Sequence, residues 1–282
     1  MRKLPVRTLL LALAGLALSV AAAHAATVKE TLRESHPLAP GGRLDVRNVN
    51  GGVVIEAWDK AEVEMIAEKQ AKAGSEAEAK KKLAEVKIEV TKTADGLKIA
   101  TKMPKRNYGF FDWVFGHSGN VNVRYTLHVP RKAELDVDTV NGGVKVSGTE
   151  GKTRLITVNG RIEVARVAGR IDAETTNGGV QVTDSRGAVS ALTTNGAIEV
   201  ELKNVTPGSD LALSTTNGGV SVRLPKGVRL SLDAATTNGR VSSEFSVAGG
   251  SSSKKRLSGD INGGGGKLRV RTTNGSISID KI

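Results

Sequence analysis

Apolar and polar residues alternate in short runs along most of the chain, and these runs recur together with Asn-Gly pairs. Apolar residues stand three and five positions after each asparagine, as Val180 and Val182 do after Asn177; only the Asn238 unit departs, with Ser243. The residues before each asparagine alternate in the same way. Strict alternation is typical of strands with one buried face. Each unit therefore predicts two strands joined by an Asn-Gly corner.

The motif x-[TV]-N-G marks a repeat. From Asn141 onward, successive asparagines are 18, 18, 18, 22, 21 and 36 residues apart, and the last interval is twice 18. Repetition at a short fixed period indicates an array or a solenoid. We expect each corner to need a positive φ, which asparagine tolerates and glycine permits without strain. The asparagines of the motif are Asn50, Asn141, Asn159, Asn177, Asn195, Asn217, Asn238 and Asn274.

Two architectures fit this alternation. An antiparallel meander with Asn-Gly hairpins would place the same positions on one face. A solenoid, whose coils stack about 4.8 Å apart, would place each residue above its own copy and so give identical Thr and Asn residues a ladder to form. We therefore expect an all-β fold, a single-stranded β-helix or solenoid with coils of about 18 residues, over residues 135–282. The asparagines would satisfy backbone groups of the corner and the next coil, although a glycan-binding row is the alternative.

The period is suspended between Trp58 and Asn141. Ser75 followed by Glu78 is a capping box, and it predicts a short helix to about Ala84. After the helix, apolar residues that alternate from Val86 to Val90 and from Val121 to Val129 predict strands, with an Asp95-Gly96 turn between them. We expect residues 26–134 to hold the first coil and a strand-and-helix cap at the N-terminal end, since an uncovered sheet edge pairs with other chains.

The first 25 residues resemble a removable leader. Arg2 and Lys3 precede an apolar run from Leu9 to Val20, and Ala23-His24-Ala25 is a small-residue cleavage site, as in secretory signal peptides. The apolar run is shorter than the roughly 20 residues that span a bilayer. An uncleaved anchor is the alternative. We expect residues 1–25 to be a signal peptide, with export to the periplasm or cell surface and no transmembrane span afterwards.

Composition and charge narrow the class of partner. The chain has no cysteine, which excludes a lipoprotein anchor and disulfides. The formal net charge is +12 and becomes +9 when Arg2, Lys3 and Arg7 leave with the leader. A basic exported protein meets anionic partners. We expect an envelope component (anionic lipid, glycan or membrane protein) and no nucleic acid.

Two segments are candidate contact sites. Five of the eight aromatic residues lie in one connection, which predicts either a tip that meets membrane or a partner, or a plug folded over the cap. Residues 248–266, rich in Gly and Ser, predict a flexible loop whose basic residues could touch polyanions. The aromatic candidates are Tyr108, Phe110, Phe111, Trp113 and Phe115, and the basic candidates are Lys254, Lys255 and Arg256.

No catalytic or metal-binding constellation stands out. The histidines after the leader, His36, His117 and His128, lack metal-ligand spacing, and His128 is expected on the outer face of a strand. Glu163 and Glu199 would lie two coils apart, about 9.6 Å by strand spacing, just beyond the separation usual in inverting glycosidases. We expect no catalytic residue, no cofactor and no metal, and hence a protein that is not an enzyme.

The order of motifs resembles the bacterial family labelled putative adhesins, a domain of unknown function with a β-solenoid fold. The resemblance is carried by "GGVVIEAWDKAEVEMIAEKQAK", with its junction Ala57-Trp58-Asp59, by "VRYTLHVPRKAELDVDTVNGGVKVSG" and by the T-[TV]-N-G coils. It implies this fold and an envelope location, and it brings no catalytic residues. We expect an exported, non-enzymatic, adhesin-like binding or scaffold protein of the cell envelope. The alternatives are an envelope-stress or regulatory protein-interaction module and a polysaccharide-active β-helix enzyme.

Overall fold

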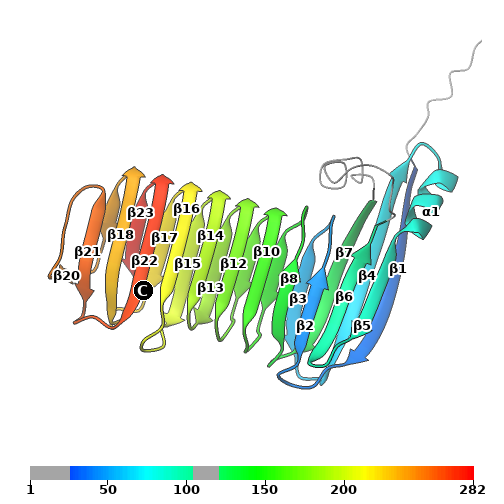
Figure 1. Ribbon diagram of the computed structural model, residues 1–282, viewed down its shortest axis with the longest axis horizontal. Coiled ribbons are helices and arrows are strands. Elements are labelled where there is room, and N and C mark those ends of the chain that lie inside the picture. Colours follow the sequence, from blue (N-terminus) through cyan, green and yellow to red (C-terminus); the bar gives the residue numbers. More distant parts are fainter. Residues whose placement is uncertain (1–25, 104–120) are drawn as a thin grey trace, which may run out of the picture.

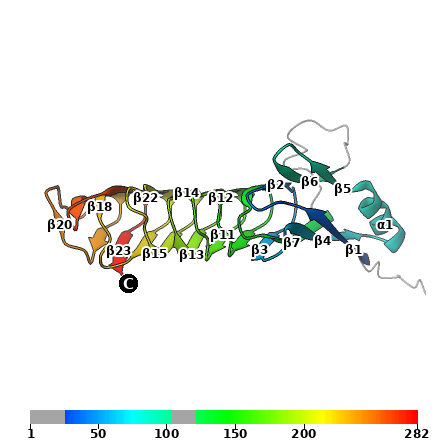
Figure 2. The same cartoon turned by 90° about the horizontal axis from the view of Figure 1, so that it is seen from below.

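The molecule is a long stack of β-coils whose strands form two opposite walls (Figure 1). The computed structural model describes residues 26–103 and 121–282. Over these residues the strands form an 11-stranded sheet A and a 12-stranded sheet B. Each coil of the stack contributes one strand to each sheet, and Figure 2 shows the sheets as the two long sides of a flattened tube. The expected all-β solenoid is confirmed.

The strands of both sheets can be followed from one edge to the other. In spatial order, sheet A holds β1 (Ala26–Pro37), β4 (Glu62–Ala73), β7 (Val121–Pro130), β3 (Val53–Trp58), β9 (Val144–Ser147), β11 (Ile162–Ala165), β13 (Val180–Arg186), β15 (Ile198–Asn204), β17 (Val220–Leu224), β23 (Ile277–Lys281) and β19 (Val241–Ser243). Sheet B holds β20 (Val247–Ala248), β21 (Arg256–Ile261), β18 (Leu230–Asn238), β22 (Gly266–Asn274), β16 (Leu211–Asn217), β14 (Val189–Asn195), β12 (Ile171–Asn177), β10 (Thr153–Asn159), β8 (Glu134–Asp138), β2 (Arg43–Arg47), β6 (Gly96–Lys102) and β5 (Lys87–Lys92).

Neighbouring coils are parallel and in register. In sheet B, Thr157 of β10 lies opposite Thr175 of β12, and Asn159 lies opposite Asn177. Strands β11 and β13 of sheet A follow the same rule. Like residues therefore stack on like residues along the molecule. This arrangement excludes the antiparallel meander, in which adjacent strands would run in opposite directions.

The space between the sheets is filled by apolar side chains, and a buried threonine two residues before the motif asparagine recurs from coil to coil. A buried hydroxyl is costly without a partner. Thr175 meets this need because its Oγ1 donates to the carbonyl oxygen of Gly160 in the neighbouring coil at 3.0 Å. In the described residues Thr139 lacks this bond, but the bond recurs at the equivalent threonine of every later coil, and these threonines tie successive coils together. They are Thr157, Thr175, Thr193, Thr215, Thr236 and Thr272.

The elements expected between Trp58 and Asn141 lie at the N-terminal end of the stack (Figure 1). Helix α1 (Glu76–Glu85) begins as the capping box predicts, because the Ser75 hydroxyl accepts from the backbone N–H of Glu78 at 3.2 Å. Its buried Ala79 and Leu83 face the sheet, and the helix packs against β4 and β1. Strands β1, β4 and β7 pair antiparallel, unlike the coils. In the described residues, the helix lies at this end only, and antiparallel pairing occurs only at this end and at the opposite one.

The C-terminal coil lies out of sequence order. Strand β22 lies between β16 and β18, and β23 lies between β17 and β19. The last interval of 36 residues is therefore not two windings in series. Instead, the coil of Asn274 inserts between the coils of Asn217 and Asn238. Because every coil carries the same corner motif, any two coils can be neighbours in register.

Candidate functional site

The first corner of each coil carries the repeated Asn-Gly pair. Each asparagine Nδ2 donates to the Oδ1 of the asparagine in the adjacent coil, at 2.8–2.9 Å. The column runs through all seven solenoid asparagines and ends on Asn50. Each asparagine between the two ends of the column thus uses one amide hydrogen and one oxygen lone pair between coils. These partners are side chains and not the backbone groups that were expected, and this bonding accounts for the repeated asparagine without a ligand.

The glycine after each solenoid asparagine is required for a different reason from the one expected. No positive φ occurs at these glycines; of the motif glycines only Gly51 has one, +120°. At Gly178, a Cβ would instead lie 2.0 Å from the carbonyl oxygen of Gly160 in the neighbouring coil. The expectation of positive φ is therefore wrong for these corners. Close backbone approach between coils excludes every side chain larger than hydrogen.

The basic candidates lie at the end of the stack far from α1 (Figure 1). Lys254, Lys255 and Arg256 are exposed. Arg256 begins β21, which pairs antiparallel with β18 and with β20, and its guanidinium lies 3.4 Å from Asp233. The expected loop over residues 248–266 is therefore wrong for residues 256–261, which form a strand. The aromatic candidates and the leader lie outside the described residues.

The acidic candidates lie on the open outer face of sheet A. Glu163 forms ion pairs with Lys145 at 3.5 Å and with Arg161 at 3.6 Å. Glu199 accepts from Gln181 at 3.4 Å, and Gln181 occupies the coil between the two glutamates. The two carboxylates are two coils apart, as the period predicts, with polar side chains between them. This face presents a row of charged side chains interrupted by the amide of Gln181.

His128 lies on the same outer face, nearer to α1. Its ring stacks on Trp58 with centroids 5.4 Å apart, and its Nδ1 lies 3.0 Å from Glu64. Among the residues that the structure describes, no three or more His, Asp or Glu side chains form a group that could hold a metal ion. In the same residues, no helix has the length and apolar character needed to cross a membrane.

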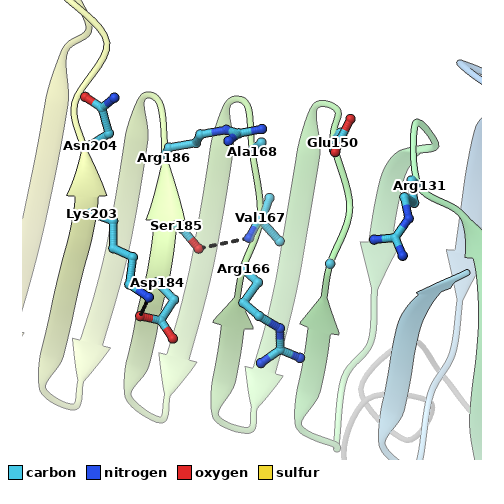
Figure 3. Close-up of a pocket in the computed structure, with 11 residues that line it drawn as sticks. Arg131, Glu150, Arg166, Val167, Ala168, Asp184, Ser185, Arg186, Lys203 and Asn204 are labelled. Atoms are coloured by element: carbon cyan, nitrogen blue, oxygen red, sulfur yellow. Dashed lines mark hydrogen bonds and ion pairs between the residues drawn. The ribbon is translucent and has the colours of Figure 1, made fainter.

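A hollow lies at the second corner, where the strands of sheet A end and the chain turns toward sheet B. We call it the second-corner groove; its volume is about 400 Å³ (Figure 3). It crosses several successive coils. Its lining residues are Arg131, Gly148, Glu150, Arg166, Val167, Ala168, Asp184, Ser185, Arg186, Lys203 and Asn204.

Local backbone irregularities shape this groove. Arg166 and Asp184 have φ of +55° and +52°, which L-residues rarely adopt. Strand β13 shifts register between Val182 and Ser185, as in a β-bulge. The bulge leaves Ser185 buried, where its Oγ accepts from the Val167 N–H at 3.1 Å. Strained residues and bulges are enriched next to functional sites.

The charges of the groove are only partly neutralised. Arg131 pairs with Asp59 at 2.6 Å, and this hydrogen bond lowers the pKa of the Asp59 carboxyl. Lys203 pairs with Asp184 at 2.8 Å (Figure 3). In the described parts of the chain, no acidic side chain forms an ion pair with Arg166 or Arg186. The groove therefore presents two arginines that are free to bind an anion.

The sequence interpretation did not find this groove. It located the second corner from Gly169 and Gly187, ten residues after their asparagines. A further signal was available in the sequence, because Arg166 and Arg186 both lie within three residues of these glycines. The bulge that brings the two side chains to one hollow is not visible in the pattern.

Comparisons with known proteins found similar solved structures and one family match. No curated protein matches the chain. A putative cell adhesion protein from Clostridium sporogenes has a structure that matches with TM-score 0.38 and 12% identity, over 90% of this chain and 100% of that one. A putative adhesin from Bacteroides fragilis matches with TM-score 0.38 and 9% identity, over 90% of this chain and 97% of that one. Residues 166–280 match the family described as Toastrack DUF4097, and the expected resemblance to a bacterial family of β-solenoid coils is confirmed.

Proposed function

We propose that this protein is an exported, non-enzymatic, adhesin-like binding or scaffold protein of the bacterial cell envelope. The observation that carries the proposal is the in-register stack. It turns each outward position into a straight column of side chains, such as Lys145, Glu163, Gln181 and Glu199. A surface that repeats about every 4.8 Å can contact an extended partner at several points. A small substrate needs only one site.

Export is supported by the sequence of residues 1–25, and an anionic partner by the charge of +9 that remains without them. In this proposal, residues 26–134 form the first coil and the cap, and residues 135–282 form the binding solenoid. The cap would protect the N-terminal sheet edge, where β1 is the last strand.

Binding is favoured over polysaccharide cleavage by the place of the acids. Glu163 and Glu199 lie on an open face, and each is engaged by a neighbouring polar side chain. A glycosidase needs one carboxyl group held protonated by its surroundings and a second on the far side of the sugar. An open, ion-paired row offers neither.

Co-sedimentation of the purified exported chain with envelope fractions tests the proposal. We expect the chain to sediment with envelopes and to release no reducing ends from envelope or plant glycans. Release that Glu163→Gln or Glu199→Gln abolishes would instead establish an enzyme. Capture of a single membrane protein, with no binding to lipid or glycan, would favour the regulatory alternative.

The aromatic segment provides a second contact in this proposal. Changing Phe111 and Trp113 together to Ser should abolish envelope co-sedimentation and leave the melting temperature unchanged. If the double variant unfolds instead, these aromatic side chains are part of the core and not a binding tip.

A further inference from the structure

We infer that the second-corner groove binds an acidic polysaccharide through the carboxylates of its sugar units. The inference rests on the proposed envelope-binding function and names the site and the chemical class of the partner. Arg166 and Arg186 would hold the carboxylates, and the floor of the groove would pack against a sugar ring. Four features of the groove lead to this assignment.

The first feature is the placement of two unpaired guanidinium groups on neighbouring coils. Ala168 lies opposite Arg186 in the next coil, and Arg166 precedes Ala168 by two residues. Figure 3 shows the Arg186 side chain extending over Ala168, with Arg166 on the other side of it. A guanidinium is always charged and offers a planar fork that matches a carboxylate. Two such forks along one groove suit two successive acidic units.

The second feature is the chemistry of the lining. Ala168, which is half-buried, gives a small apolar surface between the two arginines, while the Val167 side chain is itself buried. Asn204, Glu150 and Asp184 add amide and carboxylate groups that can bond sugar hydroxyls. Ligand pockets typically have volumes of about 300–1,000 Å³. The groove, at about 400 Å³, lies in this range.

The third feature is the net charge of the lining. The basic groups Arg131, Arg166, Arg186 and Lys203 outnumber the acids Glu150 and Asp184. Two of the basic groups are already paired, Arg131 with Asp59 and Lys203 with Asp184. The remaining positive charge attracts an anion, and the planar fork of each free guanidinium matches the two oxygens of a sugar carboxylate.

The fourth feature is shape, which separates a polymer from a membrane. The groove is a hollow lined by residues of several successive coils. A bilayer surface is flat and meets protruding side chains, whereas an extended chain can lie within a hollow. The left-handed conformations of Arg166 and Asp184 hold this shape in advance of binding.

Binding of polygalacturonate to the exported chain, measured by titration calorimetry, tests the inference. We expect the double change Arg166→Gln and Arg186→Gln to weaken binding at least tenfold, since each change removes a charge-assisted hydrogen bond. The matched control is Lys226→Gln with Arg240→Gln, which removes two exposed charges elsewhere and should leave binding within twofold. Ala168→Leu, which fills the floor without changing charge, should also weaken binding severalfold.

Absence of binding to polygalacturonate by the wild-type chain would overturn the inference. Equal losses in the groove and control variants would do the same, because net charge alone would then explain binding. Equal binding to dextran, or binding to phosphatidylglycerol vesicles that the groove variant loses, would replace the acidic polysaccharide by another ligand. If the groove variant still sediments with envelopes, the proposed function stands and this inference fails; if the wild-type chain does not sediment, the proposed function fails.

Discussion

The two corners of each coil are built by opposite means. At the first corner the same Asn-Gly pair recurs, its amides bond along a column, and its glycines lack positive φ. At the second corner the sequence changes from coil to coil, and Gly169 and Gly187 adopt φ of +131° and +115°. Two non-glycine residues there, Arg166 and Asp184, also have positive φ.

This difference separates the positions that stacking of the coils requires from the positions that can vary between coils. A residue at the first corner contacts its own copy above and below, so a change in one coil breaks two contacts. The second corner stacks closely as well, since a Cβ at Gly187 would lie 2.3 Å from the Gly169 carbonyl oxygen, but its other positions differ from coil to coil and β13 contains a bulge there. Identical residues therefore identify the scaffold, and the departures from identity identify the candidate site.

The largest expected effect is at the first-corner glycines. Gly178→Ala would place a Cβ 2.0 Å from the Gly160 carbonyl, and neither backbone can move without disturbing both sheets. We expect a loss of about 3 kcal/mol or more in the free energy of unfolding, or no folded protein. Urea denaturation measures it. Gly227→Ala is the control, because nothing lies within 4 Å of its Cβ position; it should change stability by less than about 0.5 kcal/mol.

A charged cluster on the outer face of sheet B should make a contribution to stability that depends on pH. The uncharged asparagine column of the first corner should not, so the two can be compared. Burial would raise the pKa of the Asp136 carboxyl, but hydrogen bonds and charges from Arg47 and Arg154 lower it overall. Arg154 lies 2.8 Å from Asp136. A lowered pKa stabilises the fold above the unfolded-state value of about 4, and this contribution is lost as pH falls through the folded-state value.

Asp136→Asn should therefore cost about 1–3 kcal/mol at pH 7. At pH 2, below the unfolded-state pKa of about 4, the stabilisation by the charge is smaller, and the difference between the two proteins should shrink. Chemical denaturation at both pH values measures this. A loss that is the same at both would show that packing, and not charge, stabilises the cluster.

The sequence predicted the first corner and the stack because both depend on repetition. The 18-residue interval and the alternation around Asn159, Asn177 and Asn195 are sufficient for parallel coils in register. Helix α1 was predictable because Ser75 and Glu78 form a local hydrogen-bonded motif. These signals lie within one coil or one turn.

Features that depend on how one coil differs from the repeat could not be predicted in this way. The groove results from a bulge in β13 and from small residues at Gly148 and Ala168, which differ from their counterparts in other coils. The sequence pattern also does not reveal that β22 and β23 insert out of sequence order, because every coil presents the same Asn-Gly edge to its neighbour. The reason for the first-corner glycines was missed because close approach between coils is a tertiary contact.

A smaller effect is expected within the asparagine column. Asn195→Ala removes the bond that Asn195 donates to Asn177 and the one it accepts from Asn217. The side chains are exposed, so water replaces part of the loss, and we expect about 1 kcal/mol at both pH 7 and pH 2. Asn204→Ala, in the groove, should stay within about 0.5 kcal/mol. Equal effects of the two changes would contradict a structural role for the column.

The smallest expected effect has the opposite sign. Arg166 is held at φ +55°, which costs a non-glycine residue roughly 1–2 kcal/mol, whereas glycine adopts it freely. Glycine also gives the unfolded chain more freedom, which offsets roughly 0.5–1 kcal/mol of this gain. Arg166→Gly should therefore stabilise the fold by about 0.5 kcal/mol, measured by urea denaturation, while weakening polygalacturonate binding. Arg240→Gly, beside a first-corner glycine and without positive φ, should destabilise it by about 0.5–1 kcal/mol. If Arg166→Gly destabilises as much as Arg240→Gly, the second corner stores no strain, and the groove is not held ready for a ligand.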